Sequence, residues 1–69
     1  MSDKQLAVDG SADGFKESAQ KLMTVLFDGW ILAKTQAEKD QALQRYQNGL
    51  SLLKDAHQSA QKAIDAVFP

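Results

Sequence analysis

The sequence predicts an all-α protein: an antiparallel two-helix hairpin with a flexible N-terminal arm, associating with other chains through helix packing. Three observations support this fold class. Residues 42–67 repeat apolar side chains at helical spacing, residues 15–34 contain no proline, and the first 14 residues are rich in Gly, Ser and Asp. A chain of 69 residues forms at most one domain with a thin core. We therefore assign 1–13 to the arm and 14–69 to the hairpin.

The N-terminal segment shows no sustained spacing of apolar residues. Its composition is typical of a flexible arm, and we expect it to be disordered in the free monomer. It also lacks the apolar stretch of a secretory signal peptide. Asp13 or Gly14 can cap a first helix that begins near Phe15 and runs to Lys34. The first helix is thus predicted at about 14–34.

A capping signature, rather than proline or glycine, indicates the boundary between the helices. Thr35 and Glu38 fit the S/T-x-x-E capping box, in which the hydroxyl and the carboxylate each accept a hydrogen bond from the other residue's backbone N–H. The second helix is therefore predicted at about 36–67. Asp40 is a rival N-cap, so the turn could lie anywhere from about 34 to 41. One unbroken helix of about fifty residues is the alternative, and it would need a coiled-coil partner along its length.

The second helix carries one broad apolar stripe. Its positions step by four and three residues in alternation, the spacing of a heptad seam: Ala42, Tyr46, Gly49, Leu53, Ala56, Ala60, Ala63 and Val67. A second column recurs every seven residues beside the first: Leu43, Leu50, His57 and Ile64. The opposite face is polar, so this helix is predicted to be amphipathic.

Small side chains line the centre of this stripe. The column of Ala42, Gly49, Ala56 and Ala63 favours a close approach to the first helix, although Ala is also simply the best helix former. The dipeptide Asn48-Gly49 would ordinarily suggest a break. Because the stripe keeps its phase across this dipeptide, we expect Gly49 to be helical, and a three-helix arrangement remains the alternative.

The first helix has more apolar surface than one neighbouring helix can cover. Its apolar residues surround most of the circumference: Leu22, Met23, Val25, Leu26, Phe27, Trp30, Ile31 and Leu32. A helix of this kind is usually buried on several sides, whereas a hairpin offers one. We therefore expect Phe27, Trp30 and Ile31 to face water or another chain, as an interaction surface. In the alternative, the N-terminal arm folds back over them with Leu6 and Val8.

Nothing in the sequence has the pattern of a catalytic, cofactor or metal site. There is no Cys and His57 is the single His, which we expect to be structural; it could respond to pH if an interface buries it. Phosphate loops and nucleophile motifs are absent from the sequence. We expect a non-enzyme that has no catalytic residue, no cofactor, no metal and no small-molecule substrate.

Charge and hydropathy exclude two further classes of partner. Eight basic and nine acidic residues are scattered along the chain, with a net charge of −1, which does not favour nucleic-acid binding. The longest apolar run, residues 22–33, is shorter than the roughly 20 residues that span a bilayer, so we expect no membrane span. The remaining partners are a second copy of the chain or another helical protein.

Three segments carry a resemblance to a known family: Leu32-Ala33-Lys34, Tyr46-Gln47 with Leu50-Ser51, and the tail from Lys62 to Pro69. In these segments the chain resembles the needle subunits of bacterial type III secretion systems, which are short helical hairpins that polymerise into a hollow filament. It is also similar in size to the hairpin chaperones of such subunits. The Trp-x-Gly secretion substrates match less well, because the order here is Gly29-Trp30. Needle subunits generally turn through a proline-containing loop, whereas residues 35–40 contain no proline.

The needle resemblance implies a self-assembling structural subunit. It implies subunit contacts through Ile64, Val67 and Phe68, and secretion without a cleaved signal peptide; without the resemblance a cytoplasmic location is expected. The alternative function is a small helical binding module, such as a secretion chaperone, a regulator or a phage-type inhibitor, that packs its apolar face on a partner protein. The candidate interface is therefore Phe27, Trp30, Ile31, Ile64, Val67 and Phe68.

Overall fold

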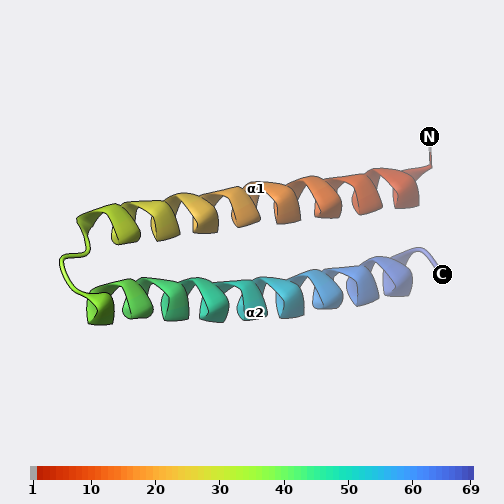
Figure 1. Cartoon of the computed structure of the whole chain (residues 1–69). Coiled ribbons are helices and arrows are strands. Elements are labelled where there is room, and N and C mark those ends of the chain that lie inside the picture. The colour runs from red at the N-terminus through yellow and green to blue at the C-terminus, as the bar shows by residue number, and fades with distance from the viewer. Residues whose placement is uncertain (1) are drawn as a thin grey trace.

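The chain forms a single helical hairpin. The computed structural model describes residues 2–69, in which α1 spans Asp3–Leu32 and α2 spans Gln36–Val67. The two helices lie side by side and antiparallel, so both ends of the chain lie at one end of the molecule and the turn at the other (Figure 1). The predicted hairpin is confirmed. The single unbroken helix and the three-helix arrangement are both wrong, since α2 continues through Gly49.

The turn between the helices is short and capped. Ala33 ends α1, and its N–H donates to the carbonyl of Trp30 at 3.2 Å. Thr35 is the N-cap of α2, as predicted, and its Oγ1 accepts from the N–H of Glu38 at 3.2 Å. The Glu38 carboxylate accepts from the N–H of Lys34 at 3.1 Å, one residue earlier than the capping box requires. These bonds satisfy backbone groups that the helix ends would leave unpaired.

The prediction of a flexible N-terminal arm is wrong for the residues that the structure describes. Helix α1 begins at Asp3 rather than near residue 14, so the segment assigned to the arm forms the first three turns of this helix. Ser2 is the N-cap, and its Oγ accepts from the N–H of Gln5 at 3.1 Å. Asp3 lies in the first turn, where a negative charge is favourable to the helix dipole.

Packing against α2 explains why this segment is helical despite its two glycines. Each of Gly10 and Gly14 costs about 1 kcal/mol relative to Ala in a helix. In compensation, Ala7, Ser11 and Phe15 recur every four residues and lie half-buried along the side of α1 that faces α2. Tertiary packing of one face supplies most of the stability of helices in proteins. The segment is therefore helical because it has a partner helix.

The apolar seam of α2 follows the predicted stripe only through its first half. Ala42, Tyr46, Gly49 and Leu53 are buried or half-buried, as expected. Beyond Leu53 the half-buried positions are His57, Ala60, Ile64 and Phe68, while Ala56, Ala63 and Val67 are exposed. An α-helix drifts by about 20° per heptad relative to a strict seven-residue repeat, so the contact passes from one column to its neighbour. The proposed packing of Ala56 and Ala63 against α1 is thus wrong.

Two glycines, Gly29 near the turn and Gly49 near the middle of α2, allow the helices to approach closely. A Cβ placed on Gly29 would lie 3.3 Å from the Cβ of Ala42. A Cβ on Gly49 would lie 2.7 Å from Cδ2 of Leu22. Both contacts are tighter than ordinary van der Waals distances. Small residues at the seam therefore set the separation of α1 and α2 from the turn to the middle of the hairpin.

The hairpin is a flat, one-layer structure. Its Cα trace measures 51 × 18 × 7 Å, so both broad faces look outward. Among the described residues, Ala42 is the single hydrophobic residue that counts as buried, with 9% of its surface exposed. A chain of this size has little core to stabilise it. The architecture leaves most of its apolar side chains available to a partner.

Candidate functional site

A ridge of large apolar side chains projects from α1 near the turn. Phe27, Trp30 and Ile31 are 57%, 41% and 77% exposed, and we call these three residues the α1 ridge. With Leu26 they line an open depression of about 410 Å³. The exposure expected for these three side chains is therefore present. Clustered apolar surface of this kind is typical of interaction sites.

The N-terminal segment does not cover this ridge. Leu6 and Val8 lie on the same continuous helix and are themselves 56% and 43% exposed. Val8 precedes Phe27 by 19 residues, which corresponds to about 28 Å of helix. The alternative in which the N-terminal segment folds back over the ridge is wrong, because a straight helix cannot reach its own later turns.

One cation lies against the ridge. The Nζ of Lys39, from the first turn of α2, is 5.3 Å from the centre of the Trp30 ring. A lysine over an indole contributes about 0.5–1 kcal/mol at exposed sites. Leu43, one turn further along α2, is 38% exposed. The turn end of the hairpin therefore presents aromatic and aliphatic surface with a positive charge beside it.

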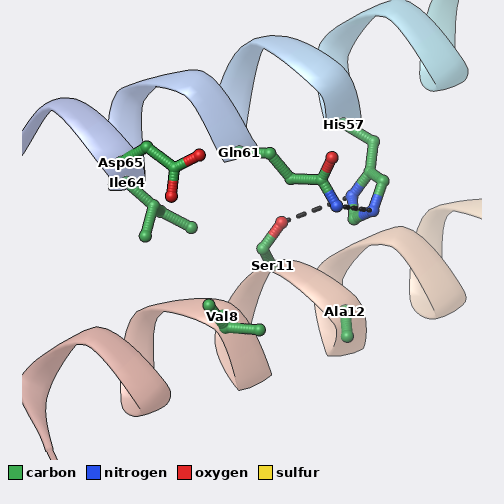
Figure 2. A pocket seen from close by; sticks show the side chains of 7 residues that line it. All are labelled: Val8, Ser11, Ala12, His57, Gln61, Ile64 and Asp65. Atoms are coloured by element: carbon green, nitrogen blue, oxygen red, sulfur yellow. Dashed lines mark hydrogen bonds between the residues drawn. The ribbon is translucent and has the colours of Figure 1, made fainter. Parts of the chain in front are cut away.

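A second feature is a hollow between the helices at the other end of the molecule. Its volume is about 290 Å³, and we call it the His57 hollow; it is lined by Val8, Ser11, Ala12, His57, Gln61, Ile64 and Asp65. Figure 2 shows Val8, Ser11 and Ala12 on α1 and the other four residues on α2, with Ser11 reaching toward His57. Unlike the ridge, this hollow combines small or apolar side chains with polar ones.

Hydrogen bonds order the His57 side chain. Its Nδ1 lies 3.3 Å from Oγ of Ser11, and its Nε2 lies 3.3 Å from the side-chain nitrogen of Gln61 (Figure 2). The Phe15 ring lies beside the imidazole, with 4.8 Å between ring centres and 52° between their planes. His57 is half-buried between the helices. These contacts give it a structural position, as the sequence indicated.

An ion pair lies beside the hollow. Nζ of Lys4 lies 3.5 Å from Oδ1 of Asp65, and the two side chains are 46% and 71% exposed. An exposed pair of this kind contributes little to stability. It nevertheless ties the first turn of α1 to the end of α2. The Asp65 carboxylate stays open to solvent and can accept a further donor.

The three tail residues that the needle resemblance implies do not form one surface. Val67 is 70% exposed, whereas Ile64 and Phe68 are half-buried. Ile64 lines the His57 hollow and points toward α1 (Figure 2). None of the three is adjacent to the α1 ridge, because the tail and the turn lie at opposite ends of the hairpin.

The His57 hollow was not expected from the sequence. Its α1 side falls within the segment that was assigned to the arm, so no pairing of Ser11 with His57 could be anticipated. One local signal was available: Ser2 and Gln5 fit the S/T-x-x-E/Q capping pattern, which indicates a helix start. The Ser2 and Gln5 capping pattern predicts a helix that includes Ser11 and Ala12, whereas the Gly, Ser and Asp content of the segment favoured a flexible arm.

No cation or membrane site emerges from the geometry of residues 2–69. In that part of the chain no three His, Cys, Asp or Glu side chains are grouped so as to hold a metal ion. Neither α1 nor α2 combines the length and hydropathy needed to cross a bilayer. Compared with known proteins, the chain matches no protein-family model, no curated protein and no solved structure.

Proposed function

We propose that this protein is a non-enzymatic, self-associating helical hairpin whose role is to assemble with further copies of itself. The observation that carries the proposal is the α1 ridge: three large side chains stay exposed, while the core of residues 2–69 is a single buried alanine. Contiguous apolar patches of a few hundred Å² on a small protein often mark interaction sites. The hairpin architecture is also the one that the needle resemblance implies, although the helix from Asp3 replaces the flexible N-terminus of that family.

The size of the ridge indicates how strong such an association can be. Large aromatic side chains bury about 150–250 Å² each, so the three exposed fractions amount to on the order of 300 Å². At about 25 cal/mol per Å², burial of this area contributes roughly 7–8 kcal/mol. Association costs about 4–15 kcal/mol in lost freedom of motion. The free energy gained by burying one ridge is thus similar to the cost of association, so we expect association to depend on protein concentration.

Sedimentation of the purified chain tests the proposal. We expect the mass to exceed that of one chain and to rise with concentration. Trp30→Asp places a charge in the ridge, so it should shift association to at least tenfold higher concentration while helicity by circular dichroism stays unchanged. Residue 30 lies on the surface in the last turn of α1, where a negative charge is unfavourable to the helix dipole by about 0.3–1 kcal/mol, a cost that leaves the hairpin folded.

Leu6→Asp is the matched control for Trp30→Asp. Leu6 is 56% exposed, lies about 36 Å from Trp30 along the same helix, and is in the first turn, where an acidic residue is tolerated. Association of this variant should match the unmodified chain. A monomer at all concentrations up to millimolar would refute self-association and would favour the binding-module alternative, in which the ridge meets a different protein.

A further inference from the structure

We infer that Asn48-Gly49 is a site of spontaneous covalent modification, namely deamidation and isomerisation, which α2 suppresses for as long as it stays helical. The inference goes beyond the proposed function and holds for a single copy of the hairpin. Asn48 is the single Asn of the chain, and the residue that follows it has no side chain. Three observations carry the inference: the dipeptide itself, the geometry that α2 gives it, and the contact of Gly49 with Leu22.

An Asn-Gly dipeptide reacts with itself when its backbone is free to move. The backbone nitrogen of Gly49 loses its proton and attacks Cγ of Asn48, so that a cyclic succinimide forms and the side-chain amide leaves as ammonia. Water then opens the ring. Cleavage of the new bond gives aspartate, whereas cleavage of the original peptide bond gives isoaspartate, in which the main chain runs through Cγ. Glycine favours the attack because no Cβ hinders its nitrogen.

Helix α2 holds the reacting atoms apart. Asn48 and Gly49 lie well inside α2, which spans Gln36–Val67. In an α-helix each backbone N–H donates to the carbonyl four residues earlier, and ψ stays near about −42°, a value from which the succinimide cannot close. The Asn48 side chain is also turned away from Gly49, because its Oδ1 accepts from Nε2 of Gln44, one turn earlier, at 3.2 Å. The reaction therefore requires α2 to open.

Packing between the helices keeps glycine at the reactive position. Gly49 is half-buried on the seam, and a Cβ there would lie 2.7 Å from Cδ2 of Leu22. A larger residue at position 49 would hinder succinimide formation, but it would also displace Leu22 from this contact. The close approach of α1 and α2 therefore retains the residue that makes Asn48 reactive.

The other three glycines provide an internal comparison. Each follows an aspartate, in Asp9-Gly10, Asp13-Gly14 and Asp28-Gly29. Aspartate forms the same ring by losing water, but its ionised carboxylate is a poorer electrophile than an amide. All four dipeptides lie within α1 or α2. We therefore expect Asn48 to react first when the hairpin opens.

The isoaspartate product disrupts α2. It adds one methylene to the main chain, so the hydrogen bonds that span position 48 lose their regular spacing. Residues after this position also change their direction around the helix axis. Leu53 and His57, which are half-buried against α1, would then leave the seam, and His57 would lose its contact with Phe15. Modification at Asn48 therefore marks chains that have unfolded and prevents them from refolding.

Trypsin makes the site measurable, because cleavage after Arg45 and Lys54 releases residues 46–54 as one peptide. The purified chain is kept at mildly alkaline pH, either folded or unfolded in guanidinium chloride. Mass spectrometry of the peptide then measures the replacement of the Asn48 amide by a carboxyl. We expect the folded chain to react at least about tenfold more slowly, the factor that about 1.4 kcal/mol of local stability supplies.

Variants test the site in the unfolded chain, where packing plays no part. Gly49→Ala in guanidinium chloride should lower the rate several-fold, because its Cβ hinders the attack on Asn48. Gly10→Ala is the matched control and should leave the rate at Asn48 unchanged.

Asn48→Asp separates the effect of the new charge from that of the altered main chain. Asn and Asp have similar helix propensities and Asn48 is exposed, so this variant should keep the helicity of the unmodified chain by circular dichroism. The isoaspartate chain, separated by chromatography, should lose most of its helicity.

Equal rates in the folded and the unfolded chain would show that α2 does not protect the site. Faster reaction at an Asp-Gly dipeptide than at Asn48 would move the site to α1. An isoaspartate chain that is as helical as Asn48→Asp would overturn the predicted loss of folding. These measurements do not depend on the mass of the assembly, so the inference and the proposed self-association can fail independently.

Discussion

At Gly29 an added side-chain atom would meet an atom of α2 that cannot move without the backbone. A Cβ there would face the Cβ of Ala42 at 3.3 Å, and that atom is fixed to the backbone of α2. At Gly49 the facing atom is instead the flexible end of the Leu22 side chain. Gly10 has no atom within 4 Å of the corresponding position. The glycines of this chain therefore differ in role although each lies within a helix.

Substitution by alanine distinguishes these roles. Gly10→Ala should raise the free energy of unfolding by up to about 1 kcal/mol, because Ala is the better helix former and the space is open. Gly29→Ala has the same local gain but forces α1 and α2 apart, so a net loss of about 1 kcal/mol is expected. Urea denaturation at one fixed protein concentration measures both. Equal stabilisation by the two variants would show that the helices do not meet closely at Gly29.

Single residues also show how far the sequence could predict the site. Trp30 and Ile31 could be placed on the surface because one neighbouring helix cannot cover a helix that is apolar on most sides. The exposure of Ala56 and Ala63 could not be predicted in the same way. A strict heptad pattern and the drift of a real helix differ by only about 20° per heptad, and the choice between adjacent columns depends on the partner helix.

The sequence predicts the N-terminus of α2 better than the N-terminus of α1. Thr35 could be recognised as a cap because Glu38 completes a capping box with it and the α2 stripe begins seven residues later. Ser2 has the same capping chemistry, but Gly10 and Gly14 lower the local preference for helix in the residues that follow. The stabilising contacts of this segment come from α2, more than forty residues away in sequence. The composition of residues 3–13 alone therefore cannot predict that this segment is helical.

Proline substitution tests whether the N-terminal segment is helical. Asp13→Pro would be harmless in a flexible arm, whereas inside α1 it removes a backbone hydrogen bond and costs about 3 kcal/mol. We expect a marked loss of helicity by circular dichroism. Asp3→Pro is the control, since Asp3 is the first helical residue and proline is tolerated there. Equal helicity of the two variants would contradict a helix that starts at Asp3.

The cap of α2 gives a second prediction for an element. Thr35→Ala removes the acceptor of the Glu38 N–H and should lower the free energy of unfolding by about 1 kcal/mol. Thr35→Ser keeps a hydroxyl and should stay within about 0.5 kcal/mol of the unmodified chain. Thermal denaturation followed by circular dichroism compares the three proteins. An unchanged Thr35→Ala variant would mean that the turn does not depend on this cap.

The molecule as a whole is a plate one helix thick, and this shape connects its stability to its function. A plate 7 Å thick at the level of the Cα atoms cannot enclose a core, so packing against a second plate is the direct way to bury more apolar surface. The same contacts that would assemble copies would also stabilise each copy. Folding and association should therefore be coupled in this protein.

This coupling predicts a melting temperature that rises with protein concentration. A partner that binds the folded chain stabilises it by up to about 1.4 kcal/mol for each tenfold increase above the dissociation constant, which is several degrees for a domain of this size. We expect this rise for the unmodified chain and for Leu6→Asp. Over the same range Trp30→Asp should show a much smaller rise, and it should melt slightly below the diluted unmodified chain because it loses the Lys39 contact and places an acidic residue in the last turn of α1. If Trp30→Asp instead shows the same rise with concentration as the unmodified chain, the indole does not lie in the interface.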